Sequence, residues 1–79
     1  MDIEIKYFGI LAEKLGKTTE RVSIEQFITD KLNLHHSFEI QYPILNSLTF
    51  NVAVDGVICN ELPTHGANVL ALLPPFAGG

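Results

Sequence analysis

The sequence has 79 residues, a formal net charge of -4, and 47% hydrophobic against 18% charged residues. We expect one ordered globular domain, because the length leaves little room for a second core and the composition lacks the low hydrophobicity of disordered chains. Five Lys and Arg residues against nine Asp and Glu provide no basic patch for a phosphate backbone, so we expect no nucleic-acid partner.

The placement of charges and the single cysteine indicate a compartment and a kind of partner. All five basic residues lie within the first 31 positions, which leaves acidic groups towards the far end and favours a basic partner there. Cys59 is the only cysteine, so no internal disulfide can form and we expect the reducing cytoplasm. No apolar run approaches ~20 residues and no basic leader opens the sequence, so we expect neither membrane insertion nor secretion.

The first third of the chain has the pattern of a β-hairpin. Apolar residues at positions 3, 5 and 7 alternate with charged ones, which predicts a half-buried strand over residues 2–8. Gly9 and Gly16 bracket residues 10–15, which are good helix formers but long enough only for a short helical turn. Residues 18–22 return to an extended pattern and complete the hairpin.

A helix is predicted to follow the hairpin. Ser23 and Gln26 have the spacing of a capping box, in which each side chain satisfies the other's backbone amide. The apolar stripe after it continues to Leu32 and predicts the main helix, ending at Asn33; its members are Ile24, Phe27, Ile28 and Leu32. Residues 35–46 lose this period and include Pro43, so they are predicted to form a loop with at most a short helix.

The rest of the domain is predicted to be β-structure. Residues 48–54 alternate, Asp55-Gly56 is typical of a two-residue turn, and residues 57–59 form its second arm. Residues 69–73 are apolar throughout, as in a strand covered on both faces. The prediction is an α+β domain over residues 1–73, with a mixed sheet of four to five strands and one main helix across one face.

The last six residues, 74–79, are predicted to form a projecting tail. Pro74 and Pro75 enforce an extended backbone, and six residues reach about 20 Å. Gly78 and Gly79 carry no side chains and can thread a narrow channel, with Ala77 before them. The Gly79 carboxyl group could be adenylated with ATP and then attacked by a sulfur donor to give a thiocarboxylate, whereas the alternative is a frayed chain end.

Two segments resemble the MoaD family, the small subunits of molybdopterin synthase. They are the ending Pro74-Pro75-x-x-Gly78-Gly79 and the opening Tyr7-Phe8-Gly9-Ile10-Leu11-Ala12-Glu13-Lys14-Leu15-Gly16. The resemblance implies a β-grasp, ubiquitin-like fold whose last strand lies parallel to the first. The family's acidic turn before the last strand is replaced here by His65-Gly66-Ala67-Asn68.

The same resemblance implies a function and partners. Gly79 would be activated by a MoeB-like adenylyltransferase, loaded by a sulfur donor protein, and inserted into a MoaE-like large subunit. There it would donate sulfur to cyclic pyranopterin monophosphate, within a heterotetramer. The chain itself would bind no cofactor and would not be an enzyme on its own.

Several other side chains are candidate sites. Phe8 with Leu72 or Leu73 is predicted to expose apolar area for docking on the sheet face without the helix, and Phe76 is predicted to anchor the tail in a partner pocket. Cys59 is predicted to be a buried structural thiol rather than a persulfide carrier. The three histidines have no metal-ligand spacing, so no metal site is expected; they are His35, His36 and His65.

Three alternative functions stay open from the sequence. A thiazole-pathway carrier resembling ThiS shares the Gly-Gly end but usually lacks the two prolines. A ubiquitin-like protein modifier would join Gly79 to a lysine through an isopeptide bond. An interaction domain with an inert tail is the third.

Overall fold

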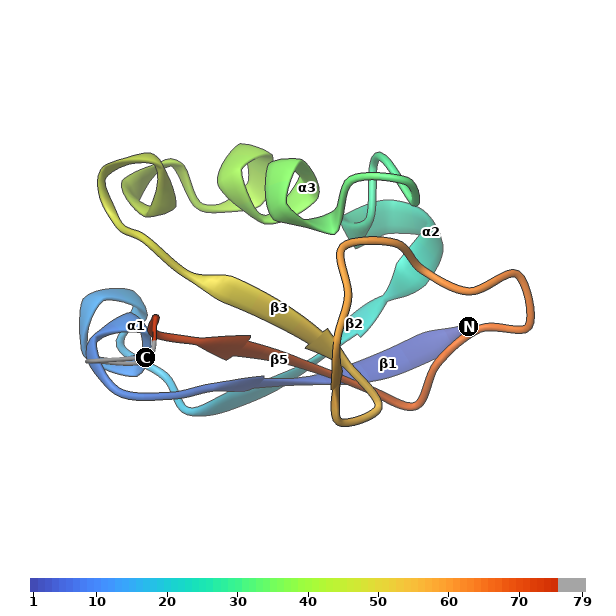
Figure 1. The fold of residues 1–79 in the computed structure, drawn as a ribbon, viewed down its shortest axis with the longest axis horizontal. Helices are drawn as coiled ribbons and strands as arrows, with labels where there is room; N and C mark the ends of the chain where they lie inside the picture. The colour runs from blue at the N-terminus through green and yellow to red at the C-terminus, as the bar shows by residue number, and fades with distance from the viewer. Residues whose placement is uncertain (76–79) are drawn as a thin grey trace.

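The computed structural model describes residues 1–75, which form a five-stranded mixed sheet with helices over one face (Figure 1). The strands lie in the order β2-β1-β5-β3-β4. Their bounds are β1 Asp2–Tyr7, β2 Thr19–Ser23, β3 Asn51–Val54, β4 Val57–Ile58 and β5 Val69–Leu73. The predicted α+β class is therefore confirmed.

The first hairpin forms as the alternating pattern predicts. β1 pairs with β2 in antiparallel register, with Asp2 opposite Ser23. Ile3 and Ile5 are fully buried beneath the helices, while Lys6 is exposed on the other face. The short helix α1, Ile10–Leu15, connects the two strands.

The second hairpin turns at Asp55-Gly56, as predicted. Both residues have positive φ, 47° and 88°, which matches the two-residue turn that joins twisted antiparallel strands. The Asp55 side chain also accepts hydrogen bonds from the amides of Asn68 and Val69, at 3.0 and 2.9 Å, and so fixes the start of β5. β3 begins at Asn51 rather than at residue 48, because the Leu48 amide still bonds to Leu45 in the preceding turn.

The predicted long helix over residues 24–33 is wrong. Helix α2, Ile24–Phe27, is a single turn. The capping box does not form, since the Ser23 hydroxyl donates to the Glu25 carboxylate at 3.2 Å instead of capping the helix. Asp30 then accepts a hydrogen bond from the Leu32 amide in a local turn, and Leu32 is left 73% exposed rather than in the core.

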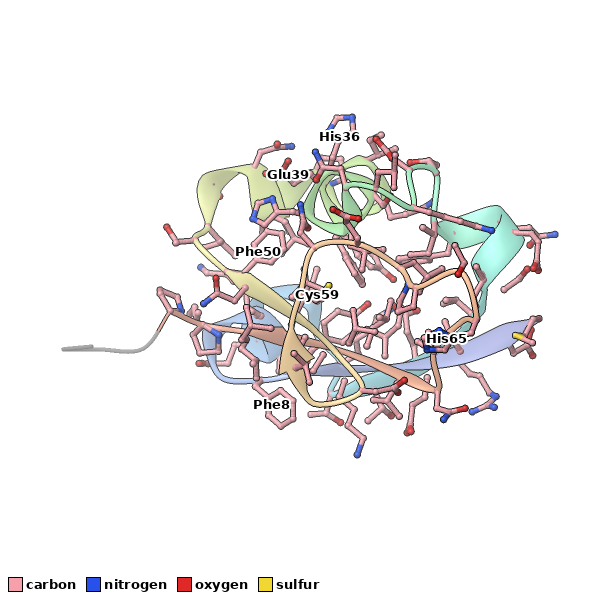
Figure 2. All side chains as sticks on the ribbon, turned by 45° about the vertical axis from the view of Figure 1, so that its right-hand side comes forward. Phe8, His36, Glu39, Phe50, Cys59 and His65 are labelled. Atoms are coloured by element: carbon pink, nitrogen blue, oxygen red, sulfur yellow. The ribbon has the colours of Figure 1, made fainter. Side chains whose placement is uncertain are left out.

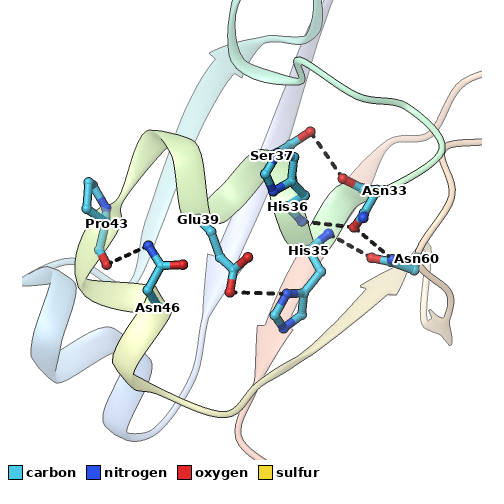
Figure 3. A network of polar contacts seen from close by, with 8 residues as sticks. All are labelled: Asn33, His35, His36, Ser37, Glu39, Pro43, Asn46 and Asn60. Atoms are coloured by element: carbon cyan, nitrogen blue, oxygen red, sulfur yellow. Dashed lines mark hydrogen bonds and ion pairs between the residues drawn. The ribbon is translucent and has the colours of Figure 1, made fainter.

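The main helix is α3, Leu34–Gln41, which lies in the segment predicted as a loop. Asn33 starts this helix rather than ending one, because its side-chain oxygen accepts from the His36 amide at 3.0 Å (Figure 3). Leu34 and Phe38, one turn apart, are both fully buried against the sheet. A 3-10 helix, η1, follows over Pro43–Ser47.

A loop distant in sequence completes the start of α3. The Asn60 carbonyl accepts from the Leu34 amide at 2.8 Å, and its side-chain oxygen accepts from the His35 amide at 2.7 Å. The Asn60 amide group in turn donates to Asn33 at 3.0 Å (Figure 3). These bonds satisfy amides that the first turn of a helix leaves unpaired. Among residues 1–75, no helix combines the length and apolar character needed to cross a membrane.

Candidate functional site

The topology brings the root of the tail to one end of the sheet. β5 lies between β1 and β3, and it runs parallel to β1, with Tyr7 opposite Leu72. The carboxyl ends of β1 and β5 therefore reach the same edge, beside α1 (Figure 1). Pro74 is half-buried there and packs against Gly9, whereas Pro75 is exposed. The tail residues Phe76, Ala77, Gly78 and Gly79 lie outside the described residues, so their roles remain predictions.

The sheet face opposite the helices carries exposed apolar side chains near this root. Phe8 is 44% exposed and points away from the sheet on the side opposite α3 (Figure 2). Ile58 on β4 is 54% exposed and lies opposite Ala53 on β3. Ala53 lies opposite Ala71 on β5, and Ala71 lies opposite Lys6 on β1. Residues directly opposite one another on adjacent strands point to the same side of the sheet, so all four lie on that face. We call this surface, formed by Phe8, Ile58, Leu73 and the two alanines, the helix-free face.

Leu72 does not belong to the helix-free face. It is fully buried in the core, because neighbouring residues of a strand point to opposite sides and Leu70 and Leu72 share the side beneath the helices. Leu73 is half-buried on the other side. The predicted docking face is thus corrected to contain Phe8 and Leu73 without Leu72.

A shallow groove of about 480 Å³ opens beside the tail root. Its lining includes Phe8, Gly9, Ala12, Thr18 and Thr19. The groove lies between the end of β1, helix α1 and the start of β2. An apolar opening is therefore contiguous with Phe8 where the tail leaves the domain.

A polar cluster that the sequence did not reveal lies on the inner side of the same region. Glu20 accepts hydrogen bonds from the hydroxyls of Tyr7 and Tyr42, the latter at 2.6 Å. Lys17 contacts Glu20 at 3.4 Å and donates to the Tyr42 hydroxyl at 3.1 Å. The only signal in the sequence was Tyr7 itself, since a tyrosine at an inward strand position needs a partner for its hydroxyl. The cluster joins β1, the loop after α1, strand β2 and the residue that follows α3.

The cluster shifts the acidity of its members. Burial alone would raise the pKa of Glu20, but the hydrogen bonds from Tyr42 and Tyr7 and the positive charge of Lys17 outweigh it and lower that pKa. Burial and the adjacent Glu20 carboxylate raise the pKa of both tyrosines. The pKa of Lys17 is raised, first by its hydrogen bond with Tyr42. The cluster is thus held as a carboxylate, two neutral phenols and an ammonium group at neutral pH.

The other candidate side chains are not brought together. Cys59 is half-buried against the core, with its thiol 3.3 Å from the Glu61 carbonyl. His35 stacks on Phe50, with ring centroids 3.8 Å apart, while His36 and His65 are exposed at separate places (Figure 2). Within residues 1–75, no three His, Cys, Asp or Glu side chains gather where they could hold a metal ion.

The strand order, the parallel central pair and the helices on one face define a ubiquitin-like β-grasp domain. The chain is similar over its whole length to SAMP1 from Haloferax volcanii, a crystal structure of which it covers 100%, with 27% identity and a TM-score of 0.64. The chain is also similar to the solution structure of the Haloferax volcanii HVO 2177 protein, with 21% identity and a TM-score of 0.63. This alignment covers 100% of the present chain and 87% of that protein, and it supports the fold alone. No protein-family model and no curated protein matches the sequence.

Proposed function

We propose that this chain is a ubiquitin-like carrier whose Gly79 carboxylate is activated by an ATP-dependent adenylating enzyme. The observation that carries the proposal is the position of the tail root. The central strand β5 delivers Pro74 and Pro75 to the sheet end where Phe8 is exposed, so a partner that binds the helix-free face has the final residues within reach. About four further residues, at ~3.3 Å each, extend to a reaction centre in the partner.

The proposed activation follows from the chemistry of a carboxylate. A carboxylate is a poor electrophile, but reaction with ATP forms an acyl adenylate and releases pyrophosphate. A nucleophile then attacks the carbonyl carbon and displaces AMP. Glycine at this position leaves the carbonyl unhindered, and the chain supplies the carboxylate while the partner supplies the catalytic side chains.

Protein modification is the first candidate for the step after activation. The ubiquitin-like fold favours this role, and the likeness to SAMP1 extends over the full length of both chains. A lysine amine of a target protein would attack the adenylate, or an enzyme thioester derived from it. The product would be an isopeptide bond at Gly79.

Sulfur transfer for molybdenum cofactor synthesis is the second candidate. The ending Pro74-Pro75-x-x-Gly78-Gly79 and the Tyr7 to Gly16 segment favour it, because both resemble the MoaD family. A MoeB-like enzyme would form the adenylate, a sulfur donor would convert it to the thiocarboxylate, and a MoaE-like subunit would accept the tail. Both candidates share the activation of Gly79 and differ only in the attacking group.

Intact-mass analysis of the chain recovered from cells tests the proposal. We expect a product that ends at Gly79, with either lysine adducts or replacement of one terminal oxygen by sulfur. Deletion of Gly79 should abolish both products and leave the unfolding temperature unchanged. A chain with one alanine appended after Gly79 is the matched control, because it keeps both glycines and moves the carboxylate; it should be as inactive as the deletion.

The outcomes separate the candidate functions. Lysine adducts support the modifier, and sulfur exchange together with loss of molybdoenzyme activity in the deletion strain supports the carrier. Modification that persists in both altered chains, or its absence in the natural one, would refute the proposal in favour of an inert interaction domain.

A further inference from the structure

Strand pairing between β1 and β5 stops at Pro74 because proline has no amide hydrogen. The Phe8 amide donates to the Leu72 carbonyl at 3.1 Å, in continuation of the parallel ladder. The next bond of such a ladder would run from the amide of residue 74 to the Phe8 carbonyl. Pro74 cannot make it, and the Phe8 carbonyl accepts instead from the Leu11 amide at 3.2 Å, at the start of α1.

The Pro74 ring then occupies the space where Gly9 has no side chain. A Cβ atom at Gly9 would lie 3.2 Å from Cγ of Pro74, with Cδ and Cβ of the ring at 3.8 and 4.0 Å. Gly9 has φ of 58°, a conformation that residues with side chains rarely adopt. Its carbonyl accepts from the Glu13 amide at 3.3 Å, so the surface under the proline is tied to α1.

Pro75 keeps the backbone at Pro74 extended. A residue that precedes proline is restricted to extended conformations, and Pro75 places this restriction on Pro74. Two consecutive prolines therefore act as a stiff spacer whose inner end rests on Gly9 and whose outer end is exposed. A residue at 74 without the ring would lose this contact with Gly9.

We infer that Pro74, seated on Gly9, is a positioning residue that sets the direction in which the residues after Pro75 leave the domain towards a partner's active site. The inference rests on the proposed function for its purpose and on the contact with Gly9 for its physical basis. Pro74 acts through the tail and touches no reacting atom.

Two pairs of variants isolate the contact. Pro74→Ala removes the ring and restores the amide, whereas Pro75→Ala removes an equally stiff residue that is exposed. Gly9→Ala introduces a methyl group against Pro74, whereas Gly16→Ala adds the same methyl group at a φ of 72° with no atom within 4 Å. Both glycine variants strain the backbone, but only one disturbs the proline.

The first measurement needs no partner. In the wild-type chain we expect nuclear Overhauser contacts between the Gly9 α protons and the Pro74 ring, and a low amplitude of motion for the Phe76 amide in ¹⁵N relaxation. Pro74→Ala and Gly9→Ala should raise that amplitude, and Pro75→Ala and Gly16→Ala should raise it less. Absence of the contact, or an equal rise in both members of each pair, would overturn the inference.

The second measurement is pyrophosphate exchange with an adenylating enzyme that activates the wild-type chain. Pro74→Ala and Gly9→Ala should lower kcat by roughly tenfold or more with little change in KM, as expected for a misplaced reacting group. Pro75→Ala should lower it by a factor of about two to five, the effect of one lost proline. The Pro74 and Gly9 effects should not multiply in the double variant, since both act on one contact.

Failure of this inference is distinguishable from failure of the proposed function. If no adenylating enzyme activates the wild-type chain, the function is refuted, while the relaxation data still decide whether Pro74 directs the tail. If the wild-type chain is activated and the two variants of each pair have the same kcat, the positioning role is refuted and the function stands.

Discussion

Glu20 shows how one side chain joins three parts of the fold near the tail root. Its carboxylate accepts from Tyr7 on β1 and Tyr42 after α3, and it contacts Lys17 in the loop after α1. The side chain is 19% exposed, so these bonds are only partly screened by water. Because Tyr7 directly precedes Phe8 and Gly9, the cluster also steadies the strand end on which the tail root rests.

The Glu20 cluster should make stability depend on pH. The pKa of Glu20 lies below its ordinary value of 4.5 in the folded chain, so the unfolded chain takes up the proton first as the pH falls. The contribution is fully present above the ordinary value and is lost as the pH falls through the folded one. Glu20→Gln should cost about 1–2 kcal/mol of unfolding free energy at neutral pH and flatten the loss of stability that begins as the pH falls below the ordinary value of 4.5.

Urea unfolding of the wild-type chain and Glu20→Gln at several pH values measures this effect. Glu13→Gln serves as the control, because Glu13 is an exposed carboxylate on α1. An unchanged pH profile in Glu20→Gln would show that the cluster does not contribute to stability.

At the scale of elements, the sequence predicted the strands and the short helix α1 well and the main helix poorly. Both hairpins and β5 follow from a two-residue apolar period and the Asp55-Gly56 turn, which are local signals. The helix prediction failed because the apolar stripe up to Leu32 continued past the turn formed by Asp30. The start of α3 depends on Asn33 and Asn60, which bond across 27 positions of sequence, and such a contact has no local signature.

For the candidate site too, local patterns were informative and contacts between distant segments were not. The tail prediction rests on local composition, from Pro74 to Gly79, and only Pro74 and Pro75 of that segment lie within the described residues. Phe8 was placed correctly on the helix-free face by strand alternation, whereas Leu72 was misplaced because a wholly apolar strand does not say which side faces the core. The contacts of Gly9 with Pro74 and of Glu20 with Tyr42 join distant segments and could be found only in the fold.

Two leucines on either side of the start of α3 test the corrected helix assignment. Leu34 is fully buried in α3 and Leu32 is 73% exposed in the preceding turn. Leu34→Ala should cost about 2–4 kcal/mol of unfolding free energy, and Leu32→Ala should change it by less than about 0.5 kcal/mol. Chemical denaturation compares the two directly, and a larger loss for Leu32→Ala would restore the long helix that the apolar stripe suggested.

At the scale of the whole molecule, the two faces differ in what surrounds their exposed apolar side chains. The helical face carries Ile44, which lies in η1 and is 45% exposed. The helix-free face carries Phe8, 44% exposed, beside the tail root and contiguous with the groove next to α1. The exposed fractions are nearly equal, so location rather than accessibility distinguishes the two positions.

This near-equality gives a matched test of the docking surface. Phe8→Asp should lower activation of Gly79 by an adenylating enzyme about tenfold or more, because a buried aromatic contact would be replaced by a charge without a partner. Ile44→Asp should leave activation within about twofold, and both variants should unfold within about 0.5 kcal/mol of the wild-type chain. Equal losses of activation would exclude the helix-free face as the docking surface, because Ile44 lies on the helical face and should not contact a partner bound to Phe8.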